Sequence, residues 1–172
     1  YEEVMFLLLF GFLPSKREFD NFNEVLRAMY ALPDDFLEMN LLRMPAQNLM
    51  NKLQHAVLTL YNYDEDPDNV EVYSTLLKGL DITAKLPSIM CYAYQSKMHY
   101  FNRESLVIHY PDKKYSIAEN ILYMLRENRQ FSEKEASLLD TILILQADHG
   151  GGNNSTFANV VVSSTGTDIY SS

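Results

Sequence analysis

Apolar side chains recur at intervals of three and four residues along most of this chain. The clearest sets are Phe19, Phe22, Leu26 and Met29, then Leu49, Leu53, Val57 and Tyr61, then Leu138, Leu139, Ile142, Leu143 and Leu145. Because an α-helix has about 3.6 residues per turn, residues at this spacing lie on one face of a helix. The pattern therefore predicts an amphipathic helix around each set.

Helix start signals reinforce this prediction. A serine stands three residues before a glutamate at 15–18, 116–119 and 132–135, the capping-box arrangement in which each side chain bonds the other residue's backbone amide. Further helix starts are expected at 33–35, with an aspartate cap, and at 45–47, with proline in the first turn. Pro87 lies inside a helical run from about 70 to 101, where it should kink or restart the helix.

Strand-like alternation is scarce along the chain. Its best examples, 106–110 and 160–162, are short, so only a small turn or hairpin near 106–112 is expected. The predicted fold class is all-α, a multi-helical array. The apolar run from Val4 to Leu13 is about half of the ~20 residues that span a bilayer, and it is interpreted as a buried core helix.

Composition narrows the choice of function. The chain has 172 residues, 47% of them hydrophobic and 22% charged, which fits one globular domain. Its net charge of −9 argues against nucleic acid or an anionic membrane as partner. Because Cys91 is the single cysteine, no internal disulfide is possible, and a reducing, cytoplasmic location is expected. Cys91 itself is interpreted as a buried structural thiol.

The sequence pattern argues against several kinds of binding site. The acidic stretch 62–69 lacks the glycine and terminal glutamate of a calcium loop, and is interpreted as a solvated connector. His55, His99 and His109 are scattered, so structural or surface roles are expected and no metal site is predicted. The triple glycine at 150–152 has no Gly-Lys-Ser/Thr after it, which excludes a P-loop.

The segment from His149 to Thr156 is the strongest remaining candidate. Three glycines separate the histidine from Asn153, Asn154 and two hydroxyl residues, between two apolar helical stretches. So many hydrogen-bonding groups suit a small anionic or carbonyl ligand. A helix C-cap followed directly by the next N-cap explains the same residues, and the residue chemistry alone leaves both explanations open.

Three stretches carry a family resemblance. Residues 143–157 read Leu-Ile-Leu-Gln-Ala-Asp-His-Gly-Gly-Gly-Asn-Asn-Ser-Thr-Phe, residues 1–14 hold Tyr-Glu-Glu and Leu-Leu-Leu-Phe-Gly-Phe-Leu-Pro, and residues 116–125 hold Ala-Glu-Asn-Ile-Leu. In this order they resemble the citrate synthases, whose corresponding stretches read in outline Leu-His-x-x-His…Asn-x-Ser-Thr, Tyr-Glu-Glu…Gly-x-Leu-Pro and Ala-Glu-Asn-hydrophobic-Leu. The glycine-rich form is similar to that of anaerobic Gram-positive bacteria.

The resemblance implies an all-α homodimer that condenses oxaloacetate with acetyl-CoA, the co-substrate, to give citrate and CoA without a further cofactor. Residues 1–172 would be one fragment of the large helical domain, truncated at both ends. By resemblance His149 hydrogen-bonds oxaloacetate and Asn153 contributes to that site. Asn154 is the alternative, although the register against Ser155 and Thr156 favours Asn153.

Two departures limit what the resemblance implies. Gln146 stands where many members have a second histidine. The family's other histidine motifs, its carboxylate base and its substrate-binding arginines lie downstream of residue 172, so no catalytic residue is expected within this chain. A 2-methylcitrate synthase, which uses propionyl-CoA, and a non-catalytic helical association domain remain the alternatives.

Overall fold

The structure, a computed structural model, describes residues 1–148, 150 and 152–172, and it is helical. The α-helices are α1 (Glu2–Phe10), α2 (Lys16–Ala28), α3 (Leu49–Leu60), α4 (Val72–Asn102), α5 (Ile117–Leu125), α6 (Glu133–Gln146) and α7 (Asn154–Ser163). A π-helix, η1 (Leu37–Leu42), and a 3-10 turn, η2 (Tyr61–Tyr63), complete the set. The described residues contain no β-strand, which confirms the all-α prediction.

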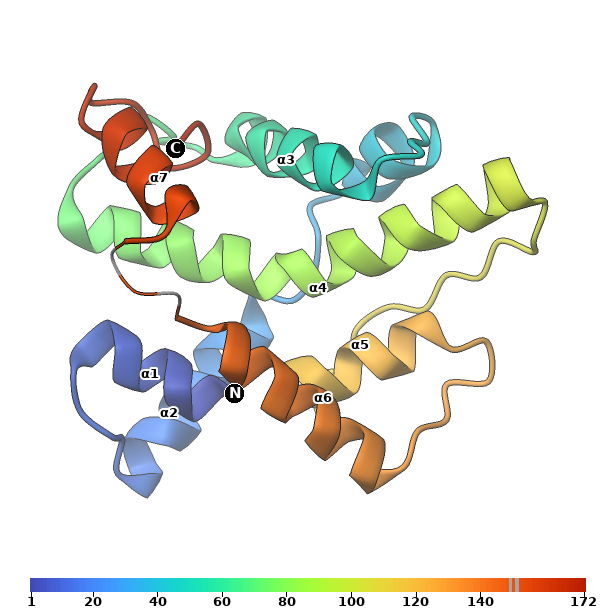
Figure 1. Ribbon diagram of the computed structural model, residues 1–172, viewed down its shortest axis with the longest axis horizontal. Helices are drawn as coiled ribbons and strands as arrows, with labels where there is room; N and C mark the ends of the chain where they lie inside the picture. Colours follow the sequence, from blue (N-terminus) through green and yellow to red (C-terminus); the bar gives the residue numbers. More distant parts are fainter. Residues whose placement is uncertain (149, 151) are drawn as a thin grey trace.

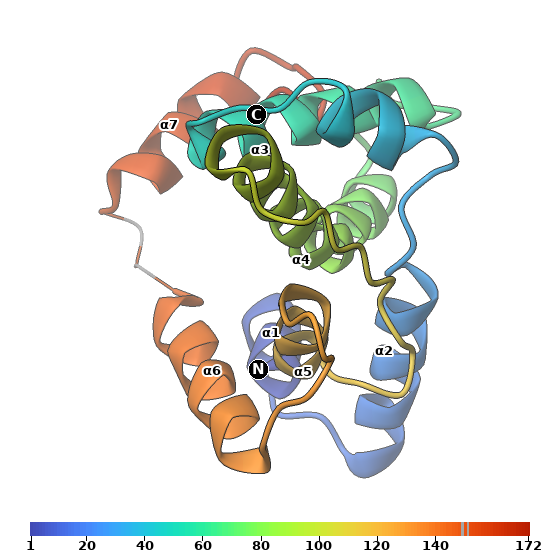
Figure 2. The same ribbon diagram turned by 90° about the vertical axis from the view of Figure 1, so that its right-hand side faces the viewer.

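The elements form two groups on either side of α4 (Figures 1 and 2). Helices α3 and α7 lie on one side, and α1, α2, α5 and α6 lie on the other. Helix α4 packs against α2, α3, α5 and η1, so its middle part is the centre of the core. Ile89, Cys91 and Tyr92 in this part are at most 2% exposed. None of the described helices is both long and apolar enough to cross a membrane.

The effect of Pro87 is smaller than a break. Proline removes one backbone donor and crowds the preceding turn, so a restart was one expected outcome. A single helix of 31 residues instead runs from Val72 to Asn102, and Pro87 is buried within it. Figure 1 shows α4 bending near its middle, which agrees with the expected kink.

The serine capping boxes are confirmed at all three positions. Ser15, Ser116 and Ser132 each accept the backbone amide three residues on, and the glutamate there accepts the serine amide. Hydrogen bonds from Arg126 and from Ser132 lower the pKa of the Glu135 carboxyl group to about 2. Capping therefore fixes where α2, α5 and α6 begin.

The helix starts expected at 33–35, from an aspartate cap, and at 45–47, from proline in the first turn, are wrong. Helix α3 begins at Leu49 rather than near Pro45, because the Asn48 carboxamide accepts the Asn51 amide at 3.1 Å and caps the helix there. At 33–35 the chain turns, with Asp35 at a φ of +62°, and η1 begins only at Leu37.

The strand-like stretches also differ from expectation. Residues 106–110 have no regular secondary structure, and the described chain places no strand beside them. Residues 160–162 lie within α7, because the capping signal at Asn153 starts a helix that continues through them. Local helix initiation thus overrides the β preference of three valines.

Helix α1 is less buried than its composition predicts. Met5 and Phe6 are in the core, at 8% and 7% exposed. Leu8, Leu9, Phe10, Phe12 and Leu13 are between 43% and 63% exposed. The interpretation of 4–13 as a buried core helix is therefore wrong for its second half, because only one face of α1 contacts α2 and the core.

Buried polar side chains tie the loops to this core. Asn120, 2% exposed, accepts the Asp112 amide at 2.8 Å through Oδ1. Its Nδ2 donates to the carbonyl oxygens of Asp112 and Tyr115 at 3.0 and 3.3 Å. One carboxamide therefore satisfies three backbone groups and fixes the turn before α5.

We predict that Asn120→Asp destabilises the fold by about 2–4 kcal/mol, because a carboxylate would face two carbonyl oxygens without a proton to donate. Urea unfolding followed by circular dichroism measures the change. The matched control is Asn159→Asp on exposed α7, which should stay within about 0.5 kcal/mol of wild type. Equal losses in the two variants would contradict the role given to Asn120.

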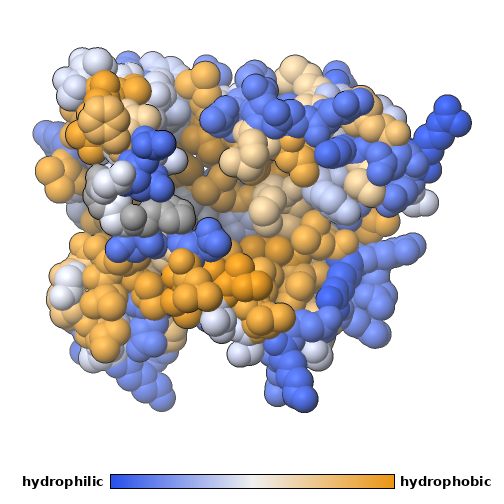
Figure 3. All heavy atoms as spheres, viewed as in Figure 1, coloured by the Kyte–Doolittle hydropathy of each residue, from blue (hydrophilic) through white to orange (hydrophobic). Residues whose placement is uncertain are grey.

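The face of α6 remains uncovered. Leu138, Ile142 and Leu145 are 63%, 44% and 73% exposed, and Ala136 is the one buried residue among those described in this helix. Figure 3 shows the resulting orange band over α6. Helix α7 has no buried residue, and its Phe157 and Val160 are 67% and 60% exposed. Contiguous apolar surface of this kind favours association.

We predict that the 172-residue chain self-associates in solution, with a sedimentation coefficient that rises with concentration. Leu138→Gln together with Leu145→Gln should weaken this association, because both side chains are exposed and carry little of the core. A chain that sediments as a monomer at high concentration would contradict the prediction.

Candidate functional site

The segment between α6 and α7 crosses from one group of helices to the other. Helix α6 ends at Gln146 in one group of helices, and α7 begins at Asn154 in the other (Figures 1 and 2). His149, the first predicted site residue, lies outside the described residues.

Two hydrogen bonds shape the described part of this connection. The Asp148 carboxylate accepts the Gly150 amide at 2.7 Å, and the Gly150 carbonyl accepts the Asn153 amide at 3.3 Å. Gly150 has a φ of +71°, a left-handed conformation in which a side chain would be strained. Glycine is thus required at 150 by the path of the backbone, whatever the segment binds.

Asn153, the second predicted site residue, caps α7. Its Oδ1 accepts the amides of Ser155 at 2.7 Å and Thr156 at 3.3 Å. This bonding confirms the N-cap explanation of the residue. It also leaves the two Nδ2 protons, which are hydrogen-bond donors, with no partner among the described residues. Ser155 and Thr156 are exposed beside it.

An apolar groove of about 660 Å³ reaches the start of this connection. Ala147 and Ile169 lie at one part of its wall. The rest is formed by α1, by the first half of α4, and by Tyr1 and Val70 just before these helices. Figure 3 shows the hollow between the two groups of helices. The groove contains few polar groups, so the hydrogen-bonding chemistry of this region belongs to the connection itself.

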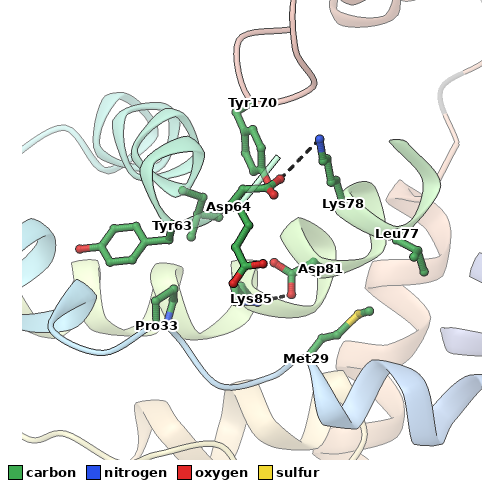
Figure 4. A pocket seen from close by; sticks show the side chains of 11 residues that line it. Met29, Pro33, Tyr63, Asp64, Leu77, Lys78, Asp81, Lys85 and Tyr170 are labelled. Atoms are coloured by element: carbon green, nitrogen blue, oxygen red, sulfur yellow. Dashed lines mark hydrogen bonds and ion pairs between the residues drawn. The ribbon is translucent and has the colours of Figure 1, made fainter. Parts of the chain in front are cut away.

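A second, polar cavity of about 430 Å³ lies between α4 and the end of α3. Figure 4 shows Lys78 and Tyr170 converging on Asp64. The Tyr170 hydroxyl donates to the Asp64 carboxylate at 2.7 Å, and the Lys78 ammonium lies 3.5 Å from the same carboxylate. Lys78 also donates to the carbonyl oxygens of Asp66, Pro67 and Asn69.

This network holds the acidic connector 64–69 in place. Burial alone would raise the pKa of Asp64, but the Asp66 amide, the Tyr170 hydroxyl and Lys78 outweigh it and lower that pKa. Burial and the nearby Asp64 raise the pKa of Tyr170 in turn. The residues are 106 positions apart, and no local pattern in the sequence signals the contact. Sequence reasoning therefore missed it.

The remaining candidates have structural roles. His109 accepts from Arg129 Nε at Nδ1 and contacts the Glu127 carbonyl through Nε2, both at 3.0 Å. His99 bonds the Glu104 carbonyl just past α4, and His55 is exposed. Burial raises the pKa of the Cys91 thiol to about 12, so it stays protonated near neutral pH. The described residues include no cluster of potential metal ligands.

We predict that Asp64→Asn destabilises the chain by about 1–3 kcal/mol at pH 7, since Lys78 loses its charged partner. The folded-state pKa of Asp64 is lowered, so its contribution is present above the unfolded-state pKa near 4 and is lost as pH falls through the folded-state value. The difference from wild type should therefore shrink toward pH 3. Thermal unfolding across pH 3–7 measures it.

The control for this prediction is Asp20→Asn, at an exposed carboxylate on α2. It should show a small difference that hardly changes with pH. A gap for Asp64→Asn that stays constant from pH 7 to pH 3 would contradict the assigned pKa direction.

Comparison with known proteins identifies the family of the chain. The family described as "Citrate synthase, C-terminal domain" matches residues 1–172. The chain is 38% identical to the citrate synthase of Haloferax volcanii over 99% of its own length and 44% of that protein. It is 31% identical to 2-methylcitrate synthase 1 of Corynebacterium glutamicum over 99% of the chain and 44% of that protein.

Solved structures agree with these sequence matches. The citrate synthase of Pyrobaculum aerophilum superimposes with a TM-score of 0.80 at 31% identity, covering 99% of this chain and 43% of that one. The citrate synthase of Thermoplasma acidophilum, solved with carboxymethyl coenzyme A and oxaloacetate, gives a TM-score of 0.85 at 23% identity over 99% of this chain and 42% of that one. The latter supports the fold alone. In each case the chain spans less than half of its relative.

Proposed function

Because the chain belongs to the citrate synthase family, we propose that the complete protein condenses oxaloacetate with acetyl-CoA to give citrate and CoA. The match of the family over residues 1–172 is the single observation that carries this proposal. The chain spans 44% of the Haloferax volcanii relative, so the reaction is assigned to the complete protein and not to these 172 residues.

Within that protein, the connection between α6 and α7 would form one wall of the oxaloacetate site. Asn153 Oδ1 is engaged in capping α7, so its Nδ2 is the group left to donate to a substrate carboxylate or carbonyl. The partial positive charge at the N-terminus of α7 also favours binding of an anion. His149 would supply a second hydrogen bond, and both residues would bind substrate without acting as acid or base.

The negative charge of the chain is consistent with a substrate site that this chain forms only in part. A dicarboxylate is normally held by arginines in bidentate contact, whereas this chain has a net charge of −9. We therefore propose that the cationic half of the site comes from the rest of the complete protein. A homodimeric, cytoplasmic enzyme of the Gram-positive anaerobe type is part of the same proposal.

A specific observation supports a different acyl-CoA as the second substrate. The Corynebacterium glutamicum relative is a 2-methylcitrate synthase, and its identity to this chain, 31%, equals that of the Pyrobaculum aerophilum citrate synthase. The alternative is therefore that the complete protein uses propionyl-CoA in place of acetyl-CoA. A non-catalytic helical association domain remains the alternative of a different class.

The chemistry predicts that the chain alone does not turn over. Removing a proton from a thioester methyl group needs a positioned base and a donor to the developing enolate oxygen. One histidine that holds the other substrate cannot supply both functions. In a coupled assay of CoA release, the 172-residue chain should therefore show no activity above its own His149→Ala control.

The decisive experiment uses the complete protein from the full reading frame. Wild type should release CoA from acetyl-CoA or propionyl-CoA in the presence of oxaloacetate, and the ratio of the two rates decides between the substrates. Asn153→Asp keeps the cap but replaces the donor, so it should raise the KM for oxaloacetate about tenfold or more with little change in unfolding temperature.

The control is Asn159→Asp on the body of α7, which should leave the KM unchanged. Wild-type KM in both Asn153→Asp and His149→Ala would contradict the assigned wall. A complete protein that releases no CoA from either thioester would contradict the proposed reaction, and would favour the association domain.

A further inference from the structure

A buried histidine outside the proposed oxaloacetate wall has contacts that fit one protonation state. His109 is 9% exposed. Its Nδ1 lies 3.0 Å from Arg129 Nε, and its Nε2 lies 3.0 Å from the Glu127 carbonyl oxygen. A guanidinium group can only donate, so Nδ1 must accept, and a carbonyl can only accept, so Nε2 must carry a proton. The contacts therefore require a neutral imidazole with its proton on Nε2.

His109 links the core of the fold to the loop between α5 and α6, residues 126–132. The Tyr92 hydroxyl of α4 donates to the His109 backbone carbonyl at 3.1 Å, so the segment that carries the histidine is tied to the core. The ring of His109 then bonds Glu127 and Arg129, which both belong to the α5–α6 loop. A change in this ring therefore acts directly on that loop.

Arg129 depends on its contacts to keep its conformation. It is exposed, and its φ of +60° is left-handed, a region that is unfavourable for a residue with a side chain. Its guanidinium carbon lies 5.8 Å from the centroid of the Tyr123 ring, and its amide donates to the Arg126 carbonyl at 3.0 Å. Of these contacts and the bond to His109 Nδ1, the bond to the histidine is the one that uptake of a proton removes.

The groups around the ring disfavour a second proton on it. Arg129 carries a permanent positive charge next to Nδ1. The phenols of Tyr92, Tyr110 and Tyr123 are the other titratable groups beside His109, and phenols are uncharged near neutral pH. Within the described chain no carboxylate forms an ion pair with His109, so no negative charge at that distance would stabilise an imidazolium.

We propose that His109 and Arg129 form a pH-sensitive switch, which holds the α5–α6 loop at neutral pH and releases it in acid. A proton on Nδ1 turns the acceptor of the Arg129 hydrogen bond into a donor, and it places positive charge on two groups whose nitrogens are 3.0 Å apart. Arg129 then leaves the ring. The bond from Nε2 to the Glu127 carbonyl persists, because both forms of the ring carry a proton on Nε2.

His99 provides an internal comparison. Its Nδ1 lies 2.8 Å from the Glu104 carbonyl oxygen. Because a carbonyl only accepts, Nδ1 of His99 carries a proton in the neutral ring, and the same hydrogen bond persists when the ring takes up a second proton. Protonation of His99 therefore breaks no contact, whereas protonation of His109 breaks one.

Nitrogen-15 NMR of the 172-residue chain tests the protonation state directly. At about pH 7.5 the ring of His109 should be neutral and protonated at Nε2. Hydrogen exchange then tests the loop: after correction for the intrinsic pH dependence, amides of 126–132 should exchange about tenfold faster at about pH 5.5 than at about pH 7.5. The unfolded chain binds more protons than the folded one in this range, so the resistance to urea should fall with the pH.

Two variants separate the switch from a general effect of acid. Arg129→Gln removes the cation, so exchange of 126–132 should be fast at both pH values and change less than about twofold. His99→Gln is the matched control and should keep the wild-type response. A neutral His109 protonated at Nδ1, exchange in wild type that is independent of pH, or an acid response that Arg129→Gln retains in full would each overturn the proposal. None of these outcomes depends on CoA release, so the proposed reaction is tested separately.

Discussion

Burial of α4 on several sides at once is the constraint on which the rest of the fold depends. Most helices of a small domain bury one face, but the middle of α4 packs against α2, α3, α5 and η1 together. Burial of apolar surface stabilises a fold by roughly 25 cal/mol per Å². A helix surrounded in this way buries apolar surface against each of its neighbours. The two groups of helices are held to each other mainly through it (Figure 1).

Polar side chains on α4 then fix how those neighbours are placed. The Ser96 hydroxyl donates to the Leu41 carbonyl at 2.9 Å, and the Gln95 amide donates to the Leu125 carbonyl at 3.1 Å. Both carbonyls lie at helix ends, where backbone acceptors lack partners within the helix. Each bond therefore satisfies a buried group and sets the register of η1 or α5 against α4. The placement of the cavities follows from this register.

The sequence predicted most reliably what depends on near neighbours in the chain. The capping boxes at Ser15, Ser116 and Ser132 hold because their partners are three residues away. Predictions failed where a distant contact decides. The second half of α1 is as apolar as a core helix, yet it is exposed because no described element covers it. The bond between Asp64 and Tyr170 had no local signal at all.

The same difference between near and distant contacts applies to the candidate site. Asn153 could be predicted to cap α7 or to bind a ligand. The structure confirms the cap by Oδ1, and Nδ2 has no partner among the described residues. Any group that its Nδ2 binds would be distant in the sequence, so the local pattern does not decide this second role. The motif at 143–157 pointed to oxaloacetate only through the family resemblance.

The most direct measurement is a crystal structure of the complete protein with oxaloacetate bound. The account predicts a substrate oxygen about 3 Å from Asn153 Nδ2 and another within hydrogen-bond distance of His149, with Asn153 Oδ1 still capping α7. Oxaloacetate bound elsewhere, with Asn153 facing solvent, would contradict it.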